Sequence, residues 1–175
     1  MNKPIRIKRI PETSIILKDF GKVDYYDVYK IQTKSNDSVD KITTGLFKIP
    51  KWVNNLMKLR DFLVRSFGLK TGNKEDVPGA TYYEVGKKAG YFTVIDRNEN
   101  EIVMAEDDKH LNFRTSTMIG RGGASTSVFL STVVQYNNFF GRLYFFFVKP
   151  FHRIIIKSLL KRYADEDKKN RFSWK

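Results

Sequence analysis

Hydrophobic and polar positions recur with two different periods along the chain, and the change of period separates strands from helices. Between residues 80 and 136 the apolar residues fall mainly at every second position, which is the spacing of half-buried strands. Short turns, the clearest at residues 120–124, connect these segments and predict an antiparallel meander. The expected strands are residues 24–33 near the start of the chain and then 80–85, 91–97, 101–106, 109–119 and 125–136.

Two helices are predicted between the first strand and this meander. Asp37 or Ser38 can cap a short helix that ends near Phe47. Pro50 suits the first turn of a second helix, and apolar residues follow it at spacings of three and four. These residues are Trp52, Val53, Leu56, Leu59, Leu63 and Phe67.

The longest apolar stretch, residues 137–163, predicts a final helix that is amphipathic. Its cations Arg142, Lys149, Arg153 and Lys157 interrupt the roughly 20 apolar residues that a membrane-spanning helix needs. At about 100° per residue these cations fall on one side of the helix, and bulky apolar residues fall on the other. The apolar side contains Leu143, Tyr144, Phe147, Phe151, Ile154 and Ile155. We expect this side to face the sheet.

These elements together predict an α+β fold. An antiparallel sheet buries one face, and the final helix offers a broad apolar surface to cover it. The predicted architecture is a curved antiparallel sheet wrapped around a long C-terminal helix, with two short helices after the first strand. Residues 1–175 would form a single domain, in which residues 1–10 and 165–175 are loose tails.

Composition narrows the classes of protein that fit this fold. The chain has no cysteine, which excludes a disulfide scaffold, thiol catalysis and cysteine-ligated zinc. It has only two histidines, and their spacing is not that of a metal site, so no metal and no cofactor is expected. The basic N-terminal residues lack the apolar core of a signal peptide. We therefore expect a cytoplasmic protein.

The net charge of +13 raises the question of an anionic partner. An excess of positive charge of this size fits contact with nucleic acid or with an anionic membrane surface. However, the lysines are spread along the whole chain, and the aromatic residues are not interleaved with cations as a base-stacking surface requires. A solvated basic surface is the simpler interpretation, and the charge alone does not favour either partner.

Four stretches resemble a known family: DYYDVY at residues 24–29, LFKIPKWVNNLMKLRDFLVRSFGLKT at 46–71, DDKHLNFRTS at 107–116 and NFFGRLYFFFVKPFHRIIIKSLLKR at 138–162. They resemble a bacterial family of unknown function that looks like a member of the START-like superfamily, also called SRPBCC. The resemblance implies the helix-grip fold of pollen allergens and polyketide cyclases, in which a curved sheet grips the last helix around an apolar cavity. It does not imply one activity, because the superfamily contains carriers, cyclases, hydratases and chaperone cofactors.

Asp108, His110, Asn112 and Arg114 form the first candidate site. Their spacing of two places all four on one face of a strand. There, His110 would act as a general base and Arg114 would bind an anionic group. The alternative is that they form the solvated face of a sheet whose other face is core.

Two further residues are candidates for acid–base chemistry. His152, at the edge of the apolar side of the final helix, would reach the cavity and meet His110; alternatively, it would bond to a carbonyl freed by Pro150. Asp27, on the first predicted strand, would supply a carboxylate. Its alternative role is structural, paired with Arg114 or Arg60.

Aromatic residues provide the third candidate site, a ligand cavity. Such residues either fill a core at native density or line a pocket for an apolar molecule. The expected lining residues are Tyr25, Trp52, Phe113, Tyr144, Phe147 and Phe151.

The first hypothesis is therefore non-covalent binding of an apolar or amphipathic small molecule between the sheet and the final helix. The alternatives are a cyclase- or hydrolase-like enzyme that uses His110 or His152 with Arg114 and Asp27, and a basic module for nucleic acid or membrane.

Overall fold

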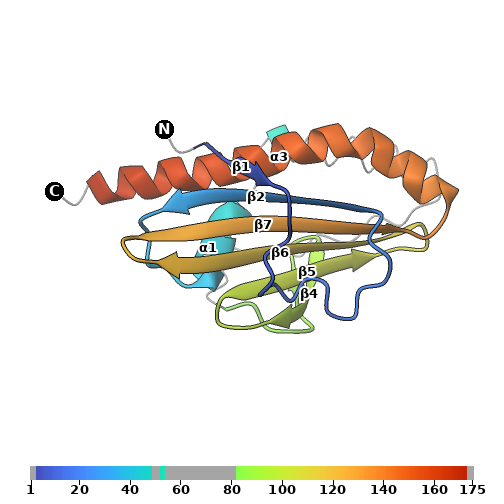
Figure 1. Ribbon diagram of the computed structural model, residues 1–175, viewed down its shortest axis with the longest axis horizontal. Coiled ribbons are helices and arrows are strands. Elements are labelled where there is room, and N and C mark those ends of the chain that lie inside the picture. The colour runs from blue at the N-terminus through green and yellow to red at the C-terminus, as the bar shows by residue number, and fades with distance from the viewer. Residues whose placement is uncertain (1–2, 49–51, 54–81, 173–175) are drawn as a thin grey trace.

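One antiparallel sheet forms the centre of the α+β fold in the computed structural model, which describes residues 3–48, 52–53 and 82–172 (Figure 1). Seven strands in these residues are ordered β1-β2-β7-β6-β5-β4-β3. They are β1 (Ile5–Ile7), β2 (Tyr25–Thr33), β3 (Lys88–Ala89), β4 (Phe92–Arg97), β5 (Glu101–Asp107), β6 (Leu111–Gly122) and β7 (Ser125–Tyr136). Consecutive pairing from β4 to β7 confirms the predicted meander.

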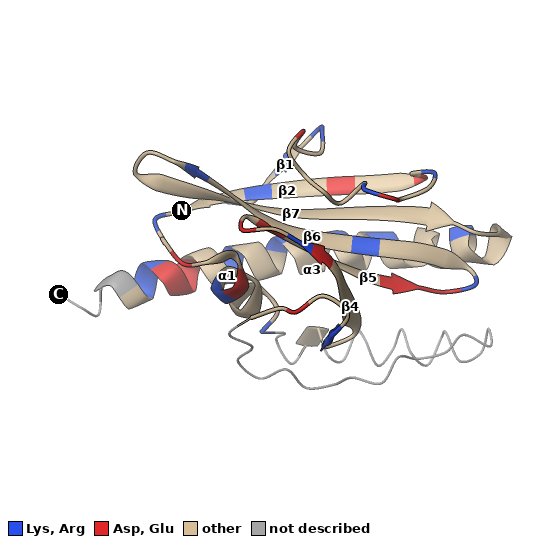
Figure 2. Cartoon of the chain, turned by 90° about the horizontal axis from the view of Figure 1, so that it is seen from below, with Lys and Arg blue, Asp and Glu red and all other residues tan. Residues whose placement is uncertain are grey.

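In the described part of the chain, two helices cover one side of the sheet. The short helix α1 (Val39–Leu46) and the long helix α3 (Phe139–Phe172) lie on this side, and α3 runs along the β2 edge (Figures 1 and 2). Residues 8–24, here called the N-terminal segment, cross the opposite side. The predicted α+β class, with a curved sheet against a long C-terminal helix, is confirmed, and the arrangement is consistent with a helix grip.

The main hydrophobic core lies between the sheet and these two helices. Alternate residues of each strand point to the helices because side chains of a strand alternate between its faces. The largest cluster of buried apolar side chains includes Tyr29, Ile42, Leu46, Ile102, Met104, Leu130 and Leu160. It draws on β2, α1, β5, β7 and α3, so packing holds all of these elements against the same sheet face.

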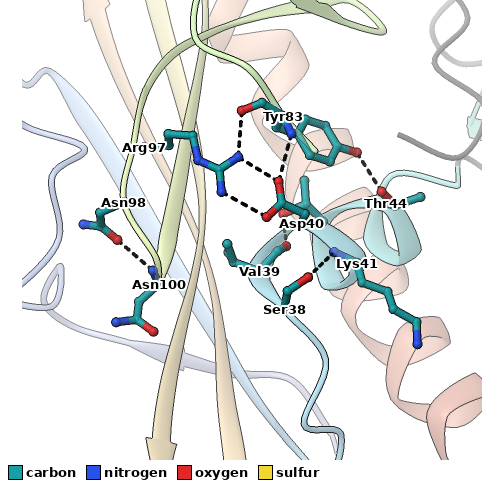
Figure 3. Close-up of polar contacts among 10 residues, drawn as sticks. Ser38, Val39, Asp40, Lys41, Thr44, Tyr83, Arg97, Asn98 and Asn100 are labelled. Atoms are coloured by element: carbon teal, nitrogen blue, oxygen red, sulfur yellow. Dashed lines mark hydrogen bonds and ion pairs between the residues drawn. The ribbon is translucent and has the colours of Figure 1, made fainter. Parts of the chain in front are cut away.

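A buried ion pair joins α1 to β4 (Figure 3). The guanidinium of Arg97 donates to both carboxylate oxygens of Asp40, at 2.8 and 3.0 Å. The backbone of Tyr83 takes part as well, because its N–H donates to Asp40 and its carbonyl accepts from Arg97. Burial raises the pKa of Asp40, but the hydrogen bond and charge of Arg97 outweigh this effect and lower the pKa.

This ion pair explains why one predicted strand is wrong. Residues 80–85 alternate as a strand does, yet residues 82–85 are not in the sheet, and the short β3 begins at Lys88. The backbone N–H and carbonyl of Tyr83 bond to Asp40 and Arg97 instead of to a neighbouring strand. A side-chain pair from distant parts of the sequence therefore overrides the local pattern.

The two predicted tails are also more ordered than expected. Ile5–Ile7 form β1, which pairs with Val28–Lys30 of β2. At the other end, α3 continues past residue 165 as far as Phe172. The predicted short helix is confirmed, because Ser38 caps α1 by accepting a hydrogen bond from the backbone of Lys41. The second predicted helix lies largely outside the described residues, of which Trp52 and Val53 are helical.

No helix in residues 3–48, 52–53 and 82–172 is both long enough and apolar enough to cross a bilayer.

Candidate functional site

A row of polar residues crosses the helix-facing side of the sheet. Asp27 of β2 lies opposite Thr132 of β7, which lies opposite Thr115 of β6. Thr117, two residues further along β6, shares this face. All four residues are buried. Because the surrounding positions form the main core, this polar row stands out as a place where the sequence departs from simple core packing.

Helix α3 brings His152 to the end of this row. The Nε2 atom of His152 lies 3.4 Å from Oδ1 of Asp27, and the side chain of His152 is 11% exposed. The hydroxyl of Tyr25 donates to the other carboxylate oxygen of Asp27 at 2.5 Å. Asp27 itself is inaccessible to solvent. A buried carboxylate is thus held from two sides, by its own strand and by the helix.

Electrostatics separate the roles of these groups. Burial raises the pKa of Asp27, but the hydrogen bonds and charge supplied by His152 and Tyr25 outweigh it, so the pKa is lowered. Burial and the adjacent Asp27 carboxylate raise the pKa of Tyr25. At neutral pH, Asp27 is therefore an ionised acceptor and Tyr25 a neutral donor, which matches the direction of their hydrogen bond.

Cations of α3 surround Tyr25 at the outer edge of this cluster. Nε of Arg153 donates to the Tyr25 hydroxyl oxygen at 3.3 Å, and Nζ of Lys149 lies 4.8 Å from the centre of the Tyr25 ring. A chain of contacts therefore runs from Arg153 through Tyr25 to Asp27 and His152. We call Tyr25, Asp27, His152 and Arg153 the interior polar cluster.

Aromatic rings hold the imidazole of His152 in place. The ring of Phe113 on β6 lies 6.2 Å from it, edge to face, and the ring of Phe145 on α3 lies 6.4 Å from it. Phe145 also packs against Tyr25 at 4.8 Å. The polar atoms of the cluster are thus enclosed by apolar surface, which strengthens their hydrogen bonds.

Two hydroxyl groups of the polar row are buried and unpaired among the described residues, and one of them, that of Thr132, lies opposite Asp27. Oγ1 of Thr132 and Oγ1 of Thr117 have no hydrogen-bond partner among the residues that the structure describes. The neighbouring Thr115 is satisfied, because its hydroxyl donates to the carbonyl of Ser131 at 3.2 Å. Since nearly all buried polar groups in folded proteins are hydrogen-bonded, Thr132 and Thr117 are exceptions within the described residues.

Some of the residues named as candidates from the sequence lie together in the structure. Asp27, His152, Tyr25 and Phe113 were all predicted as candidates, and the structure brings them together. Sequence reasoning did not identify Arg153, Thr132 or Thr117 as site residues. The signal was present for Thr117, whose position on the inner face of its strand follows from alternation. The importance of Thr132 depends on its pairing with Asp27, which only the fold reveals.

His110 lies elsewhere and has a structural position. Its Nδ1 is 3.1 Å from Oδ1 of Asn138, and this same oxygen accepts the backbone N–H of Gly141. Asn138 thereby caps the first turn of α3, and His110 supports the cap. His110 has no contact with His152 among the interactions found in the described residues, so the predicted meeting of the two histidines does not occur.

Arg114 points to the opposite side of the sheet from Asp27. It lies opposite Val133, the neighbour of Thr132, so alternation directs it away from the helices. Its guanidinium donates to the carbonyls of Ile16, Lys18 and Asp19 in the N-terminal segment. The expected partnership of Arg114 with Asp27 is therefore wrong, because the two side chains face different layers.

The aromatic residues predicted to line a cavity divide into two groups. Tyr25 and Phe113 face the interior, and Tyr144 is partly buried. By contrast, Phe147, Phe151 and Trp52 are 59%, 47% and 41% exposed. The side of α3 that faces the sheet carries Phe145, His152, Ile156 and Leu160 instead. The expectation that the Phe147 side of α3 packs on the sheet is therefore wrong.

Within residues 3–48, 52–53 and 82–172, no three or more His, Cys, Asp or Glu side chains are grouped so that they hold a metal ion. The chemistry available in the interior polar cluster is hydrogen bonding and proton exchange at Asp27 and His152.

Comparison with known proteins identifies a family but not an activity. A family model described as "Protein of unknown function (DUF2867)" matches residues 20–159. This match spans most of the sequence and includes the interior polar cluster, and the chain belongs to this family. Searches of curated proteins and of solved structures found no match.

Proposed function

We propose that this chain binds an amphipathic small molecule between the sheet and α3, with the polar end of the molecule at the interior polar cluster. The observation that carries the proposal is the pair of hydroxyls that are buried and unpaired among the described residues: that of Thr132, which lies opposite Asp27, and that of Thr117, which lies further along the same sheet face on β6. A ligand atom that bonds to these groups would satisfy hydrogen-bonding capacity that the described residues leave open.

The surroundings define the chemistry of such a ligand. Phe113 and Phe145 present apolar surface next to the cluster, so the body of the molecule would be apolar or aromatic. Thr132 and Thr117 can donate or accept, and His152 offers a ring nitrogen. The polar end would therefore carry a hydroxyl, carbonyl or carboxyl group. The agreement of the fold with a helix grip supports the proposal, as does the resemblance to the START-like superfamily.

Native mass spectrometry of freshly purified protein tests this function directly. We expect an adduct of one small molecule that dissociates on activation, and fluorescence of an apolar probe such as 1-anilinonaphthalene-8-sulfonate that this molecule reduces by competition. Phe113→Ala should weaken both signals. Phe147→Ala is the matched control, because Phe147 is exposed on the other side of α3. A protein that retains no adduct and binds no probe would contradict the proposal.

A second function is favoured by one contact. The 3.4 Å approach of His152 to Asp27 is the arrangement in which a carboxylate orients a histidine for general acid–base work. Catalysis of this kind would use His152 and Asp27 and would not require His110 or Arg114. Incubating the recovered ligand with the wild type and with His152→Gln distinguishes the two functions. A change in ligand mass that only the wild type produces indicates catalysis, whereas an unchanged mass indicates binding alone.

A further inference from the structure

An exposed row of large apolar side chains runs along the first half of α3. They are on average more than half exposed, between 47% and 70%, and we call them the aromatic stripe: Phe139, Phe140, Phe146, Phe147, Phe151 and Ile154. Separations of seven residues (139 to 146, 140 to 147 and 147 to 154), four (147 to 151) and three (151 to 154) place them on one side of the helix. This side faces away from His152 and Ile156, which face the sheet. Contiguous exposed apolar surface of this kind is typical of an interaction site.

The charge of this helix is entirely positive around the stripe. Residues 139–164 contain six lysines and arginines and no aspartate or glutamate. By helical spacing, Arg142, Lys149, Arg153 and Lys157 run along one flank of the stripe. Figure 2 shows the same asymmetry, because acidic residues of α3 occur only toward its C-terminal end. The surface is therefore apolar in the middle and cationic at its border.

We propose that the aromatic stripe docks on an anionic lipid bilayer, with α3 lying in the plane of the membrane surface. Phenylalanine side chains on one side of a helix insert into the boundary between headgroups and acyl chains, while flanking cations meet lipid phosphates. The first half of α3, which carries the stripe, would lie parallel to the surface. This docking uses the exposed aromatic side of α3, and of the interior polar cluster only Arg153 lies at the border of the stripe. The docking therefore does not depend on the proposed ligand.

Charge and chemistry favour the bilayer over two other partners. A second copy of the chain would bring two helices with the same row of cations together, and like charges oppose such an interface. A nucleic acid would neutralise the cations but leave the phenylalanines in water, because base stacking requires aromatics interleaved with the cations. A bilayer with anionic headgroups satisfies both parts of the surface.

Co-sedimentation of the full chain with phospholipid vesicles tests the inference. We expect binding to phosphatidylcholine vesicles that contain phosphatidylglycerol, weak binding to phosphatidylcholine alone, and weaker binding as salt increases. The double variant Phe146→Ser/Phe147→Ser should weaken binding at least about tenfold, because two large apolar side chains no longer insert. Its matched control is Ile5→Ser/Val85→Ser, which changes two exposed apolar residues away from α3 and should bind as the wild type does.

A second pair of variants tests the charge. Arg142→Gln/Lys157→Gln should weaken binding roughly 30-fold, because each cation near an anionic surface contributes a factor of about five. Lys34→Gln/Lys87→Gln removes the same net charge from exposed positions outside α3 and should have a much smaller effect. If both pairs weaken binding equally, general charge attracts the protein and the proposed surface is wrong.

Three further results would overturn the inference. The first is equal binding, or no binding, to the two kinds of vesicle. The second is a dimer, detected by light scattering, that Phe146→Ser/Phe147→Ser dissociates, since the stripe would then join two copies. The third is a lower unfolding temperature for that variant but not for Ile5→Ser/Val85→Ser, which would show that the stripe packs within the folded chain.

Discussion

Asp27 and His152, separated by 125 positions in the sequence, meet beneath α3 with 3.4 Å between the carboxylate and the imidazole. This contact joins the C-terminal helix to β2 through a polar group in an otherwise apolar core. It also places the one histidine of the interior polar cluster at Asp27, which lies opposite Thr132, whose hydroxyl is unpaired among the described residues. Stability and the proposed ligand site thus depend on the same residues.

The stability contributed by Asp27 should depend on pH. The pKa of Asp27 in the folded state is lowered, so its contribution is present above the unfolded-state pKa of about 4 and is lost as the pH falls through the folded-state value. We therefore expect Asp27→Asn to reduce the free energy of unfolding by roughly 2 kcal/mol at pH 6 and by much less at pH 3. Urea unfolding at the two pH values measures this difference. If the free energy of unfolding falls equally at pH 6 and pH 3, the negative charge of Asp27 is not the cause of its contribution.

Breaking the ion pair between Asp40 and Arg97 should destabilise the fold far more than breaking an exposed pair at the start of α1. Asp40 and Arg97 are mostly buried, whereas Asp37 and Lys41 form an exposed pair at 2.7 Å. Removing one partner of a buried pair leaves the other charge unpaired, so Asp40→Asn should cost about 3 kcal/mol. Asp37→Asn should cost less than about 0.5 kcal/mol. Denaturant unfolding of the two variants measures both losses. Similar losses of unfolding free energy would contradict the burial of the Asp40–Arg97 pair.

The fold was largely predictable because its elements follow local patterns. Strands β5 and β7 and helix α1 begin and end close to where alternation, turns and the Ser38 cap indicate. The exceptions have distant partners. Tyr83 leaves the sheet because of Asp40 and Arg97, and β1 forms because β2 offers its free edge. Local periodicity contains no information about such partners.

The site was only partly predictable, for two physical reasons. First, rotation of α3 about its axis cannot be read from its sequence, since both the Phe147 side and the Phe145 side are apolar. Second, the polar row depends on strand register, which places Thr132 next to Asp27. Arg114 shows the opposite kind of error. Its spacing from His110 predicted a functional site, but in the structure its guanidinium binds backbone carbonyls of the N-terminal segment.

Arg114 should hold the N-terminal segment against the sheet. Its guanidinium binds three backbone carbonyls and lies 4.8 Å from the ring of Phe20. Arg114→Met keeps the unbranched apolar stem of the side chain but removes these charge-assisted bonds, so it should destabilise the protein by roughly 2 kcal/mol. Hydrogen exchange should increase at residues 14–20, while retention of a small molecule in native mass spectrometry stays unchanged. If Arg114→Met lost the retained small molecule without faster hydrogen exchange at residues 14–20, Arg114 would be a ligand-binding residue and its proposed structural role would be wrong.

Gly141 permits the close approach of α3 to the turn before β6. A Cβ atom added there would lie 1.9 Å from the carbonyl oxygen of His110, which is a backbone atom. Glycine-to-alanine changes within helices ordinarily stabilise by about 1 kcal/mol. Gly141→Ala should instead destabilise by about 1–3 kcal/mol, because the turn or the helix must move. Gly122→Ala is the control, since nothing lies within 4 Å of its added Cβ, and its thermal midpoint should match that of the wild type.

Thr132→Val should separate ligand binding from stability. The Thr132 hydroxyl is buried and unpaired among the described residues, so a methyl group in its place should leave the free energy of unfolding unchanged or raise it by about 1 kcal/mol. The same change should weaken retention of the proposed ligand, because one hydrogen bond to its polar end is lost. Thr126→Val on the same strand is the matched control: Thr126 is also buried, but its hydroxyl donates to the carbonyl of Ser35 at 2.8 Å. This control should cost about 1 kcal/mol and leave retention intact. If Thr132→Val behaves as Thr126→Val does, in both unfolding and native mass spectrometry, then Thr132 serves the fold and the ligand contact is wrong.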